Sequence, residues 1–278
     1  MNKTLTAIVM VLGLVALTAC EKPGETPSKD GNSATGKSPT MQAAPGATTQ
    51  PAATAPAAGG DTKAPAAAAS AEKLVPIPLE LPKPRFSGTP KNLPPGTRVK
   101  ITKGVPKPRE PFLAPEGVTN VALKKAVLAS DMEPVIGTLD MVTDGEKEAV
   151  EDAFVELGLN RQWVQVDLGQ EYEIFAIVIW REHKDPRVYK DVVVKVAADK
   201  DFIEGVETVY NNDHDNSIGE GLGEAWEFFE TNEGQLVKCM DDKGKGVKAR
   251  YVRAYSNGNT VDELNRYTEI EVYARPVK

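Results

Sequence analysis

Aromatic residues are missing from the first 85 of the 278 residues of this chain. All seventeen of them, three Trp, seven Tyr and seven Phe, lie at Phe86 or beyond. A segment without aromatic side chains buries little apolar surface, so it does not form a core of its own. We therefore expect the folded part of the protein to lie in the rest of the chain.

Cysteine and histidine are also scarce, with two of each. Those numbers exclude Cys-rich zinc sites and a disulfide framework within the folded region. Blocks of basic residues are lacking as well, and the formal net charge is −7. An acidic chain without a basic block is not suited to following a phosphate backbone, so we expect no nucleic-acid partner.

The most apolar stretch, Leu5 to Leu17, is too short to span a bilayer as a permanent helix. It follows Lys3 and ends in Leu17-Thr18-Ala19-Cys20, which resembles a bacterial lipobox. We expect residues 1–20 to be a lipoprotein signal peptide and Cys20 to carry the lipid. The alternative is an ordinary signal peptide with an unrelated cysteine.

The residue after Cys20 is Glu21, whereas an Asp would resemble an inner-membrane retention signal of enteric bacteria. We therefore expect a lipid-anchored protein of the bacterial cell envelope, at the outer membrane. Residues 21–75 are rich in Ala, Pro, Gly, Ser and Thr, which predicts a disordered linker between lipid and domain.

Proline recurs eleven times between Pro76 and Pro115. Because proline fixes φ and removes a hydrogen-bond donor, residues 76–117 are expected to form an extended arm. Apolar residues between the prolines, such as Ile77 and Phe86, could lay the arm onto the domain. Val99 and Ile101 could pair as a short edge strand.

From residue 118 to 278 the pattern is that of β-strands. Trp163–Gly169 alternates apolar and polar residues, whereas Ile174–Trp180 is apolar on both faces. Val192–Val196, Val247–Tyr255 and Ile270–Tyr273 complete the expected strands, and Asp262–Tyr267 is expected to form a single helical turn. Several short strands between turn-rich loops predict an all-β sandwich or barrel.

Several motifs in this region resemble those of discoidin domains, the coagulation factor V/VIII type C modules with a galactose-binding-like fold. In family order they are Asn120-Val121-Ala122-Leu123-Lys124-Lys125, Thr143-Asp144-Gly145, Trp163-Val164-Gln165-Val166-Asp167-Leu168-Gly169, Ala249-Arg250-Tyr251-Val252-Arg253 and Glu269-Ile270-Glu271-Val272-Tyr273. The resemblance implies an antiparallel jelly-roll β-sandwich that binds ligands with loops at one end and catalyses no reaction.

The resemblance also implies a structural Ca²⁺ between the Asp-Gly loop and the last strand, held by hard oxygen ligands. Asp144 and Glu269 would give carboxylates and Thr268 a carbonyl. Ala149 stands near a position where the family has Thr, so one hydroxyl ligand is lost. The alternative is an ordinary Asp-Gly turn without metal. Cys239 has no partner in the mature chain and is expected to be a buried or idle thiol.

A first candidate ligand site is the loop Arg181–Tyr189, which contains His183, Arg187 and Tyr189. In sugar-binding discoidin modules a His and an Arg hold hydroxyls beside an aromatic ring, and these three residues supply those groups. The alternative is a solvated charged turn with Tyr189 in the core.

A second candidate is the Asx-rich loop Asn211–Asn216, which contains Asn212 and His214. Asx side chains commonly bond their own backbone, so tight turns explain this composition without any ligand. The other readings are a second metal site through Asp213 and Asp215, or one binding surface shared with His183.

These observations predict a non-catalytic module that binds carbohydrate or envelope polysaccharide. The alternative is a protein-binding or structural envelope lipoprotein without a glycan pocket. A hydrolase is not expected, because no Ser-His-Asp arrangement, phosphate loop or paired His motif is found. Exposure of Tyr189, Trp226 or Tyr267 beside His183 and Arg187 at one end of the domain would favour sugar binding. Burial of all three, together with a broad apolar patch on a sheet face, would favour a protein partner.

Overall fold

The computed structural model describes residues 72–86, 92–100 and 107–277, and all of them lie within one compact unit. The expected signal peptide, Cys20 and most of the expected linker lie outside the described residues, as do Ile101 and the final Lys278. No helix in the described part of the chain is long and apolar enough to cross a membrane.

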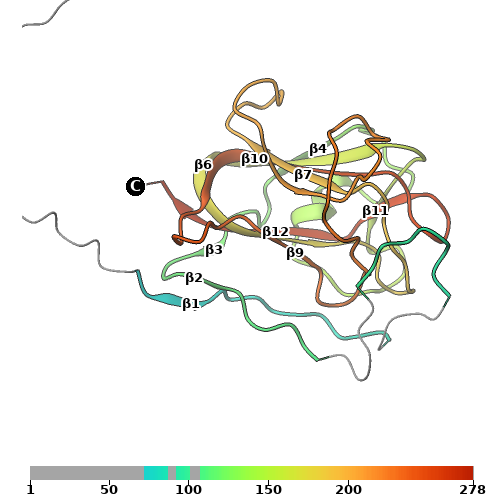
Figure 1. Ribbon diagram of the computed structural model, residues 1–278, viewed down its shortest axis with the longest axis horizontal. Coiled ribbons are helices and arrows are strands. Elements are labelled where there is room, and N and C mark those ends of the chain that lie inside the picture. Colours follow the sequence, from blue (N-terminus) through green and yellow to red (C-terminus); the bar gives the residue numbers. More distant parts are fainter. Residues whose placement is uncertain (1–71, 87–91, 101–106, 278) are drawn as a thin grey trace, which may run out of the picture. The chain divides into compact units, whose positions relative to one another are not determined.

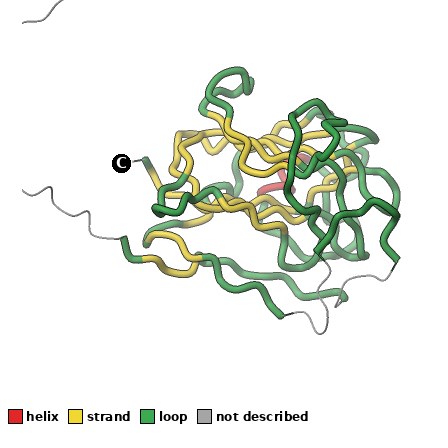
Figure 2. Tube along the Cα trace, viewed as in Figure 1, coloured by secondary structure: helices red, strands yellow, loops and turns green. Residues whose placement is uncertain are grey.

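The described chain consists of strands joined by long loops, with one short 3-10 helix (Figures 1 and 2). The elements are β1 (Leu74–Pro76), β2 (Leu113–Pro115), β3 (Thr119–Asn120), β4 (Ala126–Ala129), η1 (Leu139–Thr143), β5 (Val155–Leu157), β6 (Gln162–Trp180), β7 (Val193–Ala197), β8 (Glu207–Asn211), β9 (Gln235–Lys238), β10 (Val247–Ser256), β11 (Asn265–Tyr267) and β12 (Glu269–Pro276).

The long strand β6 belongs to both layers of a sandwich. Its first half pairs with β4 and β10, and β7 and β8 continue that layer beyond β10. Its second half pairs with β12 and β9, and β3 completes that layer beside β12. All these pairings are antiparallel, and the two layers join into one eight-stranded sheet. The all-β, antiparallel sandwich expected from the sequence is confirmed.

The bend in β6 explains how two separate sequence patterns form one strand. Gly169, which ends the first pattern, has a φ of 87°, a conformation that suits a residue without Cβ. Figure 1 shows β6 curving where the two layers meet. The two expected strands, Trp163–Gly169 and Ile174–Trp180, are therefore the two halves of β6.

The main core lies between the two layers. Alternate residues of β6, such as Val166 and Ile177, meet Val252 from β10 and Ile270 from β12, and all four are fully buried. Burial of β-branched and aliphatic side chains on both inner faces is what holds two antiparallel sheets together.

A smaller core lies on the outer face of the second layer. Phe175, Val178 and Trp180 of β6 are covered by Ile77 and Ala114, which come from the arm. Strand β1 pairs with β2, and the Ile77 amide donates to the Phe112 carbonyl at 3.0 Å. This cover explains why the second half of β6 is apolar on both faces.

Two local expectations have different outcomes in the structure. The expected helical turn at Asp262–Tyr267 is wrong, because Asn265–Tyr267 forms strand β11 and pairs with β5. Val99 does form a bridge, with Glu227.

Candidate functional site

Three loops gather at one end of the sandwich, which we call the loop end. Residues 181–192 join β6 to β7, residues 212–234 join β8 to β9, and residues 257–264 join β10 to β11. The ends of these strands are paired neighbours, since Val193 pairs with both Asn211 and Tyr255. The opposite end, which we call the far end, carries the bend of β6 and the β7–β8 and β9–β10 turns.

Backbone contacts tie the three loops together. Val188 is bridged to Phe229, and Tyr189 is bridged to Asn259. The Lys190 amide donates to the Gly258 carbonyl at 3.0 Å. The loop end is therefore a connected surface, and the two sequence-predicted ligand loops belong to it.

His183 is buried beneath this surface, with 1% of its area exposed. Its Nδ1 lies 2.9 Å from the Arg181 carbonyl, whereas Nε2 has no hydrogen-bond partner among the described residues. Burial lowers the pKa of the imidazole, so the ring is neutral at neutral pH.

Arg187 is also buried and belongs to an ion-pair network. Its Nη1 lies 2.7 Å from Glu182 and 3.6 Å from Asp262. Arg266 meets the same two carboxylates at 3.0 and 2.6 Å and also meets Glu156 at 2.6 Å. The guanidinium of Arg187 is thus held by carboxylates of the protein and braces loops 181–192 and 257–264.

Tyr189 and Tyr267 are buried around a second charged group. Arg181 lies 5.3 Å from each ring centroid and pairs with Glu230 at 3.2 Å. Burial raises the pKa of Glu230 to about 7, although Arg181 opposes that shift. Neither tyrosine offers an exposed ring to a ligand.

Asn212 and His214 lie on the second loop. The Asn212 Oδ1 accepts a hydrogen bond from the Val192 amide at 2.6 Å, and Asn212 is buried. His214 is partly exposed, and its Nδ1 lies 2.8 Å from the Gly223 carbonyl. The structure thus brings all five predicted ligand residues to one end, four of them as buried supports; their binding role stays a prediction.

Among the described residues of loop 212–234, Trp226 is the most exposed aromatic side chain, with 50% of its area exposed. The Tyr210 hydroxyl donates to the Trp226 carbonyl, and the neighbouring Ala225 amide donates to Asn211. Leu222 on the same loop is 73% exposed. The sequence offered Trp226 as one of three aromatic candidates, but no periodic pattern distinguished it from the two buried tyrosines.

Glu269 is the most unusual carboxylate at this end of the sandwich. It is fully buried, and its Oε2 accepts from the Gly145 amide at 3.1 Å, whereas Oε1 has no partner among the described residues. Burial raises its pKa to about 9, and the nearby charges of Glu271 and Asp144 add to the shift. A buried carboxylate oxygen without a donor is what a cation would satisfy.

The surrounding residues fit a divalent cation. Asp144 is partly exposed, and its Oδ1 accepts from the Glu146 amide at 2.7 Å. Thr268 is buried beside Glu269, and its amide donates to the Trp180 carbonyl at 2.8 Å. The nearby cation Lys147 is paired with Glu271 at 2.5 Å. Asp144 and Glu269 supply hard oxygens of the kind that Ca²⁺ takes.

A second group of carboxylates lies where the two ligand loops meet. One oxygen each of Asp191, Asp213 and Asp215 lie within 4.8 Å of one another. However, Asp213 already accepts hydrogen bonds from Ser217 and Ile218. Turn formation therefore accounts for Asp213, as the sequence suggested, and the group could in addition hold a metal ion.

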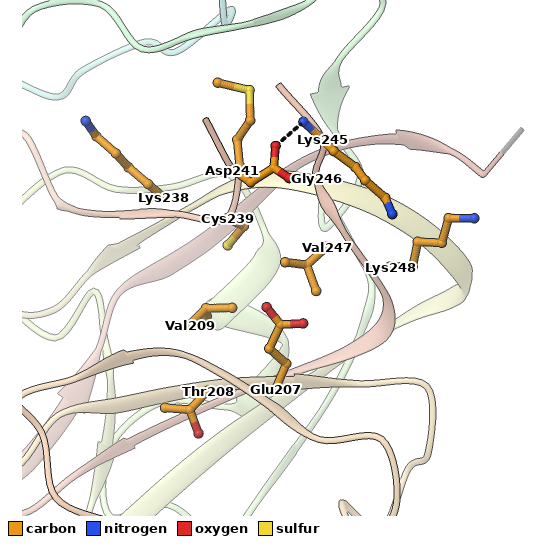
Figure 3. A pocket seen from close by; sticks show the side chains of 11 residues that line it. Glu207, Thr208, Val209, Lys238, Cys239, Asp241, Lys245, Gly246, Val247 and Lys248 are labelled. Carbon is orange, nitrogen blue, oxygen red and sulfur yellow. Dashed lines mark hydrogen bonds between the residues drawn. The ribbon is translucent and has the colours of Figure 1, made fainter. Parts of the chain in front are cut away.

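A cavity of about 620 Å³ lies at the far end of the sandwich, away from these loops (Figure 3). Its lining includes Glu207 from β8, Lys238 and Cys239 at the end of β9, and Val247 from β10. Burial raises the pKa of Cys239 to about 12, so this thiol stays protonated at neutral pH. None of the sequence-predicted site residues lines this cavity.

No protein-family model matches the sequence, and a search of curated proteins finds no match. Similar solved structures include a family 89 glycoside hydrolase from Clostridium perfringens in complex with PUGNAc, at 20% identity and a TM-score of 0.40 over 57% of this chain and 15% of that one. The likeness spans less than a sixth of the length of that enzyme.

Among the similar structures are carbohydrate-binding modules. Chitosan-binding module 1 of a chitosanase/glucanase from Paenibacillus sp. IK-5 is 20% identical, with a TM-score of 0.36 over 55% of this chain and 98% of that one. A fucose-binding module from Streptococcus pneumoniae is 16% identical, with a TM-score of 0.37 over 55% and 96% of the two chains. These likenesses are distant, and the fold assignment rests on the strand pairing described above.

Proposed function

We propose that this protein is a non-catalytic carbohydrate-binding lipoprotein of the bacterial cell envelope, and that it binds sugar at its loop end. The observation that carries the proposal is Trp226, a half-exposed indole on a connected surface of loops. The C–H face of a sugar packs against an aromatic ring, and an exposed Trp is suited to that contact.

Polar groups around Trp226 would orient the sugar. His214 is partly exposed on the same loop. Its Nδ1 lies 2.8 Å from the Gly223 carbonyl and its Nε2 is buried without a hydrogen-bond partner, so in this proposal the side chain turns to bring Nε2 to a sugar hydroxyl. His183, Arg187, Tyr189 and Asn212 are buried, so in this proposal they hold the loops in place from beneath. Of the five residues that the sequence predicted, His214 retains the direct role.

We also propose that Asp144, Glu269 and the Thr268 carbonyl hold a structural Ca²⁺. The unpartnered Oε1 of Glu269 supports this site, because a buried carboxylate without a donor is costly unless it is protonated or bound to a cation. Lipid on Cys20 would anchor the protein to the outer membrane, as the Leu17-Thr18-Ala19-Cys20 motif suggests.

The proposal is tested by a glycan array probed with the full-length protein in detergent, with and without Ca²⁺. Binding should fall about tenfold in Trp226→Ala, since stacking between two aromatic rings contributes about 0.5–1.5 kcal/mol beyond the area buried, and the loss of the buried indole area adds to that. Ile203→Ala is the matched control, because Ile203 is 78% exposed in the β7–β8 turn at the far end. Glycan binding that survives Trp226→Ala, or no glycan binding at all, would contradict the proposal and favour a protein partner.

A further inference from the structure

We infer that the loop-end site takes acidic saccharides, because the arm places a lysine beside Trp226. This inference rests on the proposed function, and it concerns Lys100, which lies outside the sandwich. The Lys100 ammonium is 5.7 Å from the centroid of the Trp226 ring. The arm therefore contributes a cation to the surface on which the sugar would stack.

The position of Lys100 is fixed by the residues just before it. The Arg98 amide donates to the Glu227 carboxylate at 2.5 Å, and the Glu227 amide donates to the Arg98 carbonyl at 3.1 Å. Val99 and Glu227 form a parallel bridge. Since Glu227 follows Trp226 directly, this register sets Lys100 against the indole.

Lys100 is the cation that meets the ring of Trp226. The Glu227 carboxylate accepts a hydrogen bond from the Arg98 amide and keeps its charge, whereas Lys100 is exposed and its ammonium contacts only the ring among the described residues. The protein carries a formal net charge of −7, so an acidic ligand needs a local cation to approach it. Glu224 is the exposed carboxylate nearest to Trp226 in the sequence, and its negative charge counteracts the attraction of Lys100 for an anion.

The chemistry of the pair matches a uronic acid. The carboxylate of such a sugar lies at the edge of the pyranose ring, while the C–H face remains free to stack. Lysine has a flexible four-carbon stem, so its ammonium can leave the indole and meet the carboxylate as the sugar takes its place. The free protein holds the cation over the ring by a cation–π contact until the ligand arrives.

The test compares polygalacturonate with its methyl-esterified form, which has the same backbone without the charges. Binding of the full-length protein is measured by calorimetry at low and at high salt. Lys100→Gln keeps the stem but removes the charge, and Lys238→Gln is the control because Lys238 is exposed on β9 at the far end. An exposed ion pair predicts a loss of about threefold to fivefold for polygalacturonate in Lys100→Gln, and none for the ester.

The outcomes separate this inference from the proposed function. Two results together support the inference and the proposed function. Trp226→Ala should lose binding to both probes, and Lys100→Gln should lose binding to polygalacturonate alone. If Lys100→Gln affects the two probes equally or affects neither, the inference is overturned while the loop-end site stands. Equal binding of the two probes by the wild-type protein, or no binding of polygalacturonate, overturns it as well. If Trp226→Ala binds both probes as the wild-type protein does, the site itself is misplaced.

Discussion

Glu269 is a buried residue whose charge state depends strongly on its surroundings. Its carboxyl has a pKa of about 9 in the folded protein, against an ordinary value of 4.5. Between those two values the folded state binds a proton that the unfolded state has lost, so the free energy of unfolding falls as pH rises from about 4.5 to about 9. A bound cation removes this penalty because it stabilises the ionised form.

We therefore predict that, in the presence of a chelator, the melting temperature of the protein falls as the pH rises from 5 to 9. Glu269→Gln, which stays neutral, should flatten that dependence. Added Ca²⁺ should raise the melting temperature of the wild-type protein, and more at pH 8.5 than at pH 5.5. At a hundredfold excess over Kd the stabilisation is about 2.7 kcal/mol, or roughly 5–11 °C. The measurement is a series of thermal melts at fixed pH.

Asp144→Asn provides the companion variant. Its loss should weaken the Ca²⁺ response and reduce the pH dependence without abolishing it, because the Asp144 charge adds to the pKa shift of Glu269 whereas burial is the larger cause. Glu230 has a pKa of about 7 and therefore makes its own contribution to the change of melting temperature with pH. That contribution is the same in the wild-type protein and in Glu269→Gln. A calcium response that persists in the double variant Asp144→Asn with Glu269→Gln would refute this site.

Arg187 illustrates how a buried ion pair changes an expectation. The sequence suggested a ligand-binding arginine in a loop, whose loss would affect binding rather than stability. In the structure Arg187 pairs with Glu182 in a buried network, so Arg187→Ala leaves Arg266 alone to balance the carboxylates of Glu182 and Asp262. We predict a loss of about 3 kcal/mol in the free energy of unfolding.

That loss is measured by urea denaturation. Lys190→Ala is the control, since Lys190 lies on the same loop but its ion pair with Glu263 is exposed. A variant of Arg187 that melts like the wild-type protein but no longer binds glycan would restore the direct binding role that the sequence suggested.

The arm is the element that the sequence identified without revealing how it packs. Its prolines indicated an extended segment, and the apolar residues between them suggested contact with the domain. The structure adds the β1–β2 pairing and hydrogen bonds from Arg109, whose Nη1 and Nη2 donate to the Gly234 and Glu233 carbonyls at 2.8 and 2.9 Å. The arm covers apolar residues of β6, so it is part of the folded domain.

We predict that a chain beginning at Val118 is far less stable than one beginning at residue 72. Without the arm, Phe175 and Val178 on the outer face of β6 lose their cover, and exposed apolar patches of this kind cause aggregation. The single substitution Ile77→Ala should cost about 2 kcal/mol, or roughly 4–8 °C in melting temperature.

Thermal melts and light scattering of the two truncated chains test the prediction. Leu81→Ala is the control within the arm, since Leu81 is 44% exposed whereas Ile77 is 8% exposed. If the chain from Val118 melts and stays monomeric like the longer one, the arm is not part of the stable fold.

Local pattern was sufficient for the strands but not for the site. The β-branched run Val192–Val196 and the alternation of apolar and polar residues in Trp163–Gly169 each predict a strand from neighbouring residues alone. No knowledge of distant contacts is needed for that prediction. The burial of Arg187 depends on Asp262, which lies far away in the sequence, and the burial of Tyr267 depends on a pairing of β11 that its polar neighbours concealed. Contacts between residues so far apart in the sequence cannot be predicted from the spacing of neighbouring residues.

At the scale of the whole molecule, membrane attachment remains a prediction from the sequence. We predict that Cys20→Ser moves the protein from the membrane to the soluble fraction, because the thiol is the lipid acceptor. Immunoblots of fractionated cells measure this. Cys239→Ser is the control, since Cys239 is a buried free cysteine whose loss should leave the fractionation unchanged. A Cys20→Ser protein that stays in the membrane would refute the lipobox interpretation.

The path of the arm has a mechanical consequence. The chain enters the fold at β1, and β3, which follows the arm, pairs with the part of β12 remote from the loop end. A pulling force between a glycan held at the loop end and the chain before Leu74 would act first on the short β1–β2 pairing. Once the arm detaches, the chain from residue 74 to residue 117 would add roughly 150 Å of length, at about 3.4 Å per residue. Lys100 would leave Trp226 with the arm, so load would remove this cation from the ligand site before it separates the three loops.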